Sequence, residues 1–154
     1  MKVAARAAAE KAAAERAREA ALEEEEHRQC AAWLASGARG LVHRVWGNPP
    51  RLLRRPSGHD WAIEAIPVHW HTVLYEALIY NGLWRDFALD DCWTALRTAS
   101  ITWTHDDDYA LKALMSCLDT FVDAGLVMSV GPERWRACGR INQWKQVPGR
   151  MPRG

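Results

Sequence analysis

Histidines and aspartates lie close together at three places in the chain, and side chains of these types can bind a metal ion. The three places are His59-Asp60, His69-x-His71 and His105-Asp106-Asp107-Asp108. Imidazoles and carboxylates are suitable ligands for zinc or iron. His69 and His71 are two residues apart, however, and on a helix such side chains point about 200° from each other. We therefore expect one of them to be packed, the other exposed, and no metal to be bound.

Motifs of known catalytic sites are missing from the sequence. There is no G-x-S-x-G, no P-loop, no H-E-x-x-H and no Gly-rich dinucleotide fingerprint. Ser116 and Ser129 have no base beside them in the sequence, and Glu64 and Glu76 are single carboxylates. We expect a protein that is not an enzyme and that uses no cofactor.

Positive charge is concentrated in two segments, although the net charge of the 154 residues is only +1. The formal charge is −1 over residues 1–37, +5 over 38–58, −8 over 59–128 and +5 over 129–154. Arginine and lysine bind phosphates, and an indole ring can stack on a base or a sugar. The candidate nucleic-acid-binding residues are Arg134, Trp135, Arg136, Arg140, Lys145, Arg51, Arg54 and Arg55, with Trp144 as a second stacking candidate and Arg39 and Arg44 as possible extensions.

Two segments flank the part of the chain that can form a core. Residues 1–37 are rich in Ala, Glu, Arg and Lys, which predicts a helix, but they lack an apolar stripe. We expect this helix to be exposed to solvent and to serve as a spacer or connector rather than a coiled coil. Residues 38–58 combine glycines and prolines with five arginines and predict a basic, irregular linker, either laid over the domain or contacting phosphates. Residues 142–154 predict a flexible basic tail.

The compact domain is predicted to span residues 59–141 and to contain three helices. The first runs from Pro67 to a stop at Asn81-Gly82, and the second from Leu89 to about Ala99, with acidic residues in its first turn. The third covers about 106–124, where apolar residues recur at steps of 3 and 4. Gly125 supplies its left-handed end, with Leu126 as the accompanying apolar contact.

A β-hairpin is predicted after the third helix. Leu126, Met128 and Val130 alternate on one strand, Gly131-Pro132 makes the turn, and Trp135 and Ala137 face the same side from the other strand. The arginines at 134, 136 and 140 then point to solvent. A short extended piece, SITWT at 100–104, is expected between the second and third helices.

Three helices followed by a hairpin resemble the winged helix-turn-helix superfamily. The residues that carry the resemblance are ALKALMSCLDTFVDAGLVMSVGPERWRA, within a domain of about 68–141. The resemblance implies a recognition helix at about 106–124 and a wing at 127–140. It also implies a short strand between the first and second helices, whereas SITWT follows the second. The outer face of the third helix offers Asp107, Asp108, Lys112, Asp119 and Asp123, so we expect little reading of base edges.

The expected function is that of a nucleic-acid-binding accessory or regulatory protein that holds the DNA or RNA backbone through its basic wing and linker. The alternative is a winged-helix module for protein–protein interaction in a larger assembly, in which the acidic helical face meets a basic partner or another copy. Salt-sensitive binding to unrelated nucleic acids separates the two. We also expect no membrane segment, because the sequence has no apolar run of about 18 residues. Cys30, Cys92, Cys117 and Cys138 show no CxxC spacing, so we expect reduced cysteines and a cytoplasmic location.

Overall fold

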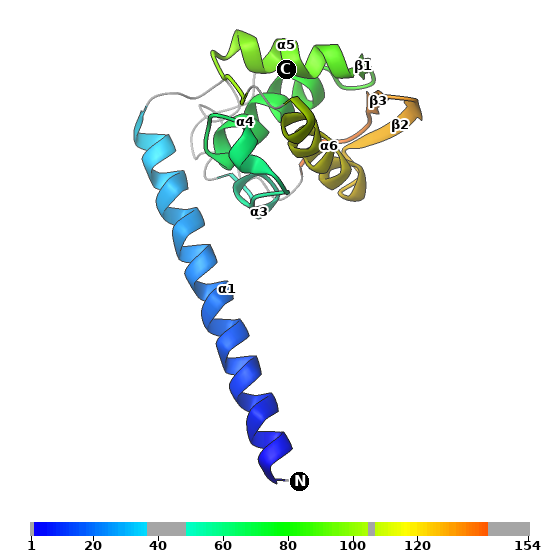
Figure 1. The fold of residues 1–154 in the computed structure, drawn as a ribbon. Helices are drawn as coiled ribbons and strands as arrows, with labels where there is room; N and C mark the ends of the chain where they lie inside the picture. The colour runs from blue at the N-terminus through cyan, green and yellow to red at the C-terminus, as the bar shows by residue number, and fades with distance from the viewer. Residues whose placement is uncertain (1, 37–48, 105–106, 142–154) are drawn as a thin grey trace, which may run out of the picture.

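The computed structural model describes residues 2–36, 49–104 and 107–141. The protein is mainly helical, with a long N-terminal helix, several shorter helices and a small C-terminal antiparallel sheet, which confirms the predicted fold class (Figure 1). The elements in chain order are α1 (Lys2–Ser36), α3 (Arg51–Arg54), the 3-10 helix η1 (Asp60–Ala62), α4 (Pro67–Leu74), the π-helical η2 (Tyr75–Tyr80), β1 (Asp86–Ala88), α5 (Leu89–Thr98), α6 (Asp107–Asp123), β2 (Val127–Gly131) and β3 (Arg134–Ala137).

Helix α1 projects away from the compact part of the molecule (Figure 1). Nearly all its described side chains before Glu25 are exposed, as its composition predicts. Towards its C-terminal end, however, Glu26, Cys30 and Trp33 are buried, and the latter two pack against Val68 of α4. The helix is therefore docked at one end, and only its outer part is surrounded by solvent.

The residues before η1 are more ordered than an irregular linker. Arg51–Arg54 form the short helix α3, and Leu53 at its centre is fully buried in the main core. Burial of this leucine fixes the positions of the arginines on either side of it. Arg39 and Arg44, in the first part of the predicted linker, lie outside the described residues.

Helix α4 continues directly into η2, and together they run through the core from Pro67 to Tyr80, as predicted. Pro67 occupies the first turn, where its missing N–H has no helical partner to lose. The helix stops before Gly82, where a Cβ would lie only 2.6 Å from the backbone oxygen of Leu78. Glycine is therefore required at this stop.

The ends of α5 and α6 follow local signals in the sequence. At the start of α5, the carboxylate of Asp91 accepts a hydrogen bond of 2.8 Å from the backbone N–H of Ala88. After α6, Gly125 has a φ of 77°, its N–H donates to the oxygen of Val122, and the N–H of Leu126 donates to that of Phe121. This pair of bonds is the Schellman arrangement, and it confirms the predicted end of the helix.

The sheet has the strand order β1-β3-β2, and both pairings are antiparallel. Strand β1 was not predicted, and it lies between the first two helices of the domain. The extended piece predicted at 100–104 is not a strand of this sheet, since only Trp103 pairs there, in an isolated bridge to Ile63.

The prediction that Leu126, Met128 and Val130 share the buried face of the hairpin is wrong. Leu126 and Val127 are both buried, whereas Met128 and Val130 are exposed. Leu126 belongs to the turn that ends α6, and of the residues of β2 that follow it, Val127 is the buried one, paired with the buried Ala137. The far end of the hairpin extends beyond the core.

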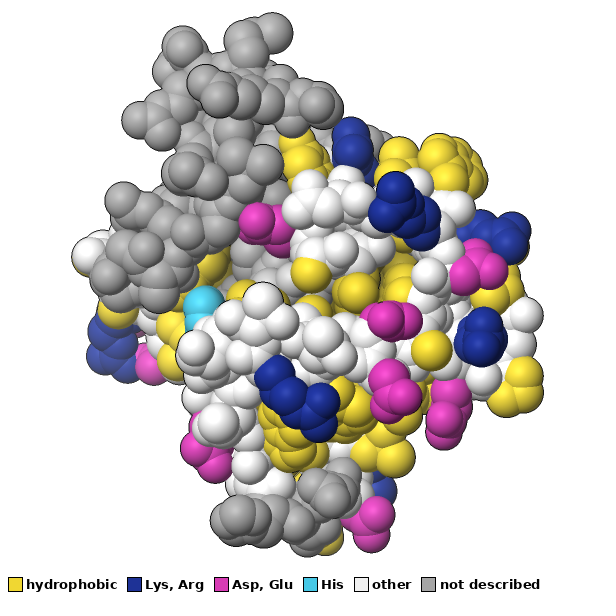
Figure 2. Space-filling view, turned by 90° about the horizontal axis from the view of Figure 1, so that it is seen from above, with side chains coloured by type: hydrophobic (Ala, Val, Ile, Leu, Met, Phe, Trp, Pro, Cys, Tyr) yellow, Lys and Arg dark blue, Asp and Glu magenta, His cyan; other side chains and the backbone are white. Residues whose placement is uncertain are grey.

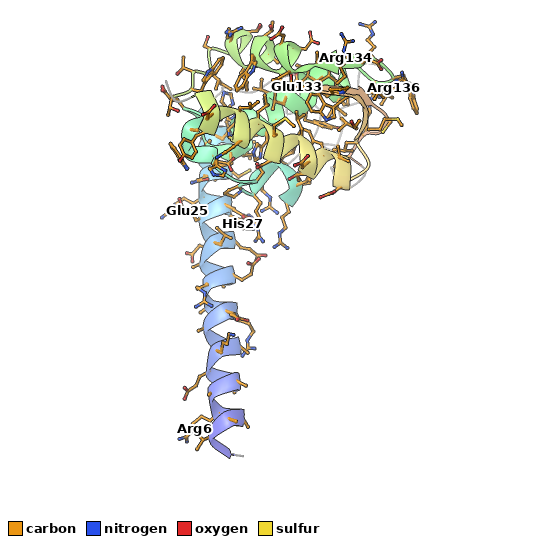
Figure 3. The ribbon with its side chains drawn as sticks, turned by 45° about the vertical axis from the view of Figure 1, so that its right-hand side comes forward. Arg6, Glu25, His27, Glu133, Arg134 and Arg136 are labelled. Carbon is orange, nitrogen blue, oxygen red and sulfur yellow. The ribbon has the colours of Figure 1, made fainter. Side chains whose placement is uncertain are left out.

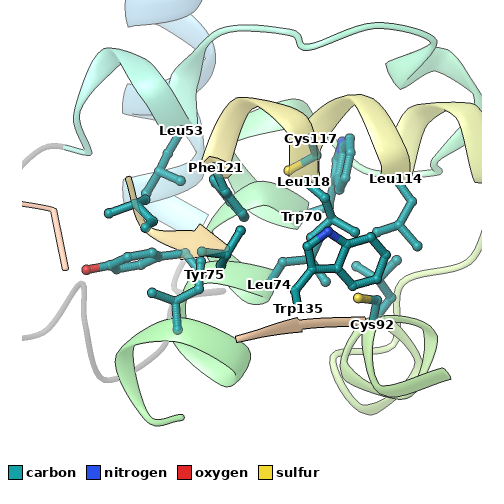
Figure 4. Packing of buried hydrophobic residues seen from close by; sticks show 14 of the residues in the cluster. Leu53, Trp70, Leu74, Tyr75, Cys92, Leu114, Cys117, Leu118, Phe121 and Trp135 are labelled. Atoms are coloured by element: carbon teal, nitrogen blue, oxygen red, sulfur yellow. The ribbon is translucent and has the colours of Figure 1, made fainter. Parts of the chain in front are cut away.

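The core lies between α4, α5, α6 and the inner face of the sheet (Figure 4). Its central side chains include Trp70, Leu74, Cys92, Leu114, Leu118, Phe121 and Trp135. Leu114, Leu118 and Phe121 of α6 recur at the predicted steps of 4 and 3. The buried cysteine packs as a small apolar group. This packing holds β3 rigidly, and β3 carries two of the candidate arginines.

Candidate nucleic-acid interface

The outer face of the hairpin carries the arginines that the sequence places there. Arg134 and Arg136 alternate with the buried Trp135 and Ala137, so both guanidinium groups are exposed. Figure 3 shows them together at the end of the molecule away from the projecting part of α1 (Figure 3). Arg134 makes no hydrogen bond or ion pair within the described residues. Arg85, just before β1, is also exposed.

Arg136 is partly neutralised by a carboxylate on the neighbouring strand. Its Nε lies 2.6 Å from Oδ1 of Asp86, with which it is in register, and both side chains are nearly half exposed. The hydrogen bond from Arg136 lowers the pKa of Asp86 below its ordinary value. Exposed pairs of this kind contribute little net stability, so a phosphate oxygen can replace the carboxylate.

Trp135 is not available to stack on a nucleobase. It is only 5% exposed, and its ring stacks on that of Phe87 with a centroid distance of 5.7 Å. The role proposed for it from the sequence is therefore corrected, because Trp135 serves as the core contact of the hairpin. Trp144 and Lys145 lie outside the described residues.

Arg140 is tied to the end of η2. Its Nη2 donates a hydrogen bond of 2.8 Å to the backbone oxygen of Tyr80, and its guanidinium carbon lies 4.4 Å from the centroid of the Tyr80 ring. These contacts satisfy a helix-terminal carbonyl and use one face of the cation. Arg140 therefore has a structural role in addition to any contact with a ligand.

The three described arginines of the basic linker face α1. Arg51 and Arg55 both bind Glu19, at 2.7 and 2.5 Å, and Arg55 also binds the buried Glu26 at 2.7 Å. Arg54 lies 3.3 Å from both ring nitrogens of His27. Of the two states expected for the linker, laid over the domain or contacting phosphates, these contacts correspond to the first, because Arg51, Arg54 and Arg55 cross-link α3 to α1. The sequence contains no signal for this pairing, since the partners are 27 to 36 residues apart.

The outer face of α6 is acidic, as predicted. Asp108, Asp119 and Asp123 are exposed, and Lys112 lies over the ring of Tyr109. Carboxylates repel phosphates, so this helix is not suited to entering a major groove. Figure 2 shows positive and negative side chains interleaved over one face of the domain, without a large patch of a single sign (Figure 2).

An exposed aromatic cluster at the start of α6 was not predicted. Trp61 is 63% exposed, and its ring centroid lies 5.1 Å from that of Tyr109, which also contacts His59. The three residues come from segments about 50 positions apart, so no sequence pattern could indicate that they meet.

The histidines do not assemble a metal site among the described residues. His69 accepts a hydrogen bond of 2.9 Å from the indole N–H of Trp33, and burial lowers the pKa of His69. His71 is almost fully buried, with Nε2 3.0 Å from Oδ1 of Asp60 and Nδ1 3.1 Å from the backbone oxygen of Leu53. The outcome differs slightly from the expectation of one packed and one exposed histidine, since His69 is half-buried.

Ser57, His71 and Asp60 are close together but do not form a catalytic triad. The hydroxyl of Ser57 and the carboxylate of Asp60 both approach the same nitrogen of His71, Nε2, at 3.5 and 3.0 Å. A triad needs the nucleophile and the carboxylate on opposite ring nitrogens, and here Nδ1 faces a backbone oxygen. The cluster is therefore best explained as a packing and hydrogen-bonding element.

The four cysteines are free in the structure. No described helix is both long enough and apolar enough to cross a membrane. No protein-family model, curated protein or solved structure matches this chain.

Proposed function

We propose that this protein binds the sugar–phosphate backbone of nucleic acids through the outer face of its hairpin, with little reading of base sequence. The observation that carries the proposal is the alternation of β3, which puts Arg134 and Arg136 side by side on an exposed, rigidly supported ribbon. The order of elements adds support. A helix, a strand that joins the hairpin, two further helices and then the hairpin is the arrangement that the winged-helix resemblance implies.

Binding by this surface alone is expected to be modest. Arg85, Arg134 and Arg136 can make about three phosphate contacts. The logarithm of the binding constant then falls linearly with the logarithm of the salt concentration, with a slope of about 2.7. Between 50 and 200 mM salt this slope corresponds to a loss of about 40-fold in affinity. Because Trp135 is buried and the outer face of α6 is acidic, neither the wing tryptophan nor this helix supplies base-specific contacts.

The test is the double charge reversal Arg134→Glu/Arg136→Glu in the full chain, with binding to an unrelated 20-base-pair duplex measured by fluorescence anisotropy. We expect a loss of affinity of about tenfold or more, together with a shallower salt slope. The matched control is Arg6→Glu/Lys11→Glu, which makes the same change of charge on the outer part of α1. Equal losses in the two variants, or no loss in the first, would contradict the proposal. Arg134→Ala provides a milder variant that leaves the pair between Arg136 and Asp86 intact.

A second candidate function is docking of a basic protein partner, without nucleic-acid contact. The observation in its favour is the run of exposed aspartates on α5 and α6, namely Asp90, Asp91, Asp108, Asp119 and Asp123. Such a surface complements Lys- and Arg-rich segments. Failure of the wild-type protein to bind any DNA or RNA oligomer at 50 mM salt would favour this function over the first.

A further inference from the structure

The arginines of α3 form a second basic surface, distinct from the hairpin, and carboxylates of α1 cover it. Glu19 bridges the guanidinium groups of Arg51 and Arg55, and Glu23 lies 3.9 Å from Arg55. The hydrogen bond to Glu19 is the largest cause of the raised pKa of Arg55. Arg51, Glu19 and Glu23 each keep about half of their side-chain surface exposed, so these contacts are open to exchange with a dissolved anion.

The covered surface borders a groove that suits a nucleic-acid strand. The groove has a volume of about 610 Å³ and lies between α3 and the C-terminal part of α6. Arg51 and Arg55 contribute guanidinium groups, and the remaining lining residues are Pro50, Leu52, Pro56, Ser57, Thr120 and Ala124. A positively charged groove that follows the phosphate backbone is one feature of single-strand sites, and here the two guanidinium groups supply it.

Docking of α1 also uses contacts other than those of Glu19 and Glu23. The helix is held by its apolar contact through Cys30 and Trp33 and by the hydrogen bond from Trp33 to His69. Glu19 precedes Trp33 by 14 residues, which is about 21 Å along the helix. Glu26, whose side chain is 2% exposed, binds Arg55 from the buried side. The contacts of the two exposed glutamates are therefore additional to these docking contacts.

We propose that Glu19 and Glu23 act as built-in competitors of nucleic-acid phosphates, so that α1 keeps the α3 surface closed to the backbone until the glutamates are displaced. This inference rests on the proposed function, because it names a second surface for the same class of ligand. Neutralising the two glutamates frees Arg51 and the exposed side of Arg55. About two phosphate contacts are gained, and the salt slope rises by about 1.8.

The test compares Glu19→Gln/Glu23→Gln with the control Glu10→Gln/Glu15→Gln, again in the full chain and with single-stranded and duplex oligonucleotides. Both variants remove two negative charges from α1, and glutamine is nearly as good a helix former as glutamate. The control positions are exposed and precede the segment that contacts α3. We expect the first variant to gain about fivefold or more in affinity at 50 mM salt over the control, together with the steeper slope. About half of the rise in salt slope should be lost when Arg51→Gln is added, because Arg55 remains free to bind a phosphate.

Three outcomes separate this inference from the proposed function. Equal gains in the two glutamate variants, or no gain in either, would overturn the competition while binding through the hairpin stands. Binding that appears only in Glu19→Gln/Glu23→Gln, and that is insensitive to Arg134→Glu/Arg136→Glu, would support the competition and overturn the hairpin as the interface. No binding by any variant at 50 mM salt would overturn both. Circular dichroism and thermal melting of each variant check that α1 and its docking are retained.

Discussion

Replacement of Asp60 tests the hydrogen-bonding element that joins α3, η1 and α4. One carboxylate oxygen of Asp60 accepts hydrogen bonds from the backbone N–H groups of Ser57 and Gly58, at 2.9 and 2.8 Å. The other oxygen lies 3.0 Å from Nε2 of His71, although not along a hydrogen-bond direction. His71 in turn lies within hydrogen-bond distance of the backbone oxygen of Leu53 through Nδ1. The carboxylate thus connects the loop before η1 to a buried histidine.

The size of the effect depends on which of these contacts a substitution keeps. Asp60→Ala removes the acceptor for both N–H groups and the carboxylate beside Nε2 of His71. At about 1.5–3 kcal/mol for each bond to a charged group, less the water that can reach the half-buried loop, the loss is about 3 kcal/mol. Asp60→Asn keeps an oxygen for the two N–H groups. Its amide nitrogen can donate to Nε2 of a neutral His71 that carries its proton on Nδ1, so the loss is about 1 kcal/mol.

Urea unfolding at pH 7.5, followed by tryptophan fluorescence and circular dichroism, measures both variants. With a slope near 1.5 kcal/mol per molar urea, the midpoint should fall by about 2 M for Asp60→Ala and by about 0.7 M for Asp60→Asn. Equal shifts for the two variants would show that the backbone acceptor role is not what matters. A loss below about 0.5 kcal/mol for Asp60→Ala would refute the reasoning altogether, since that is the range of an ordinary surface residue.

Two further predictions concern the docking of α1 and the extent of the core. Burial lowers the pKa of His69. Its neutral form, which accepts the Trp33 N–H, therefore stabilises the fold above the ordinary histidine pKa of 6.5, and this stabilisation is lost as the pH falls below 6.5. The melting temperature of His69→Gln should therefore fall less between pH 7 and 5 than that of the wild type, and equal falls would contradict the assignment. Leu53→Ala should cost about 2–5 kcal/mol, because its side chain is fully buried. The control Leu22→Ala, at a side chain that is 40% exposed, should cost less than about 0.5 kcal/mol, and similar costs in urea unfolding would place α3 outside the core.

The helices of the domain could be predicted from the sequence because their signals are local. Pro67 marks a first turn, Asp91 caps α5, and Gly125 with Leu126 ends α6, and each of these acts within a few residues of itself. The apolar steps of 3 and 4 along α6 likewise depend only on the geometry of one helix. Such features predict the same local structure regardless of the tertiary fold around them.

The hairpin could be predicted from its alternation and its turn, but strand β1 and the docking of α1 could not, because each depends on a partner far away in the sequence. The three residues of β1 show no alternation of their own, and they become a strand only because β3 pairs with them 46 to 50 positions later. The prediction of which β2 residues face the core was wrong for a related reason. Leu126 forms part of the turn that ends α6, so the strand begins one residue later. Trp33 could be recognised as apolar, but not as the residue that meets His69.

Segment charges were a poor guide to which arginines a ligand can reach. Residues 38–58 carry five arginines and no acid, and residues 1–37 have a net charge near zero, so the counts favour the linker as a site for a polyanion as much as residues 129–154. In the fold, however, all three described arginines of the linker point at α1, where the local sequence Glu23-Glu24-Glu25-Glu26 is acidic although the whole helix is balanced. Arg134 instead belongs to a strand whose partner β1 offers only Asp86, and Arg136 takes that carboxylate. The accessible positive charge is therefore set by the placement of acidic residues on neighbouring elements. We expect the proposed affinity for phosphates to respond more to substitutions of Glu19 and Glu23 than to the net charge.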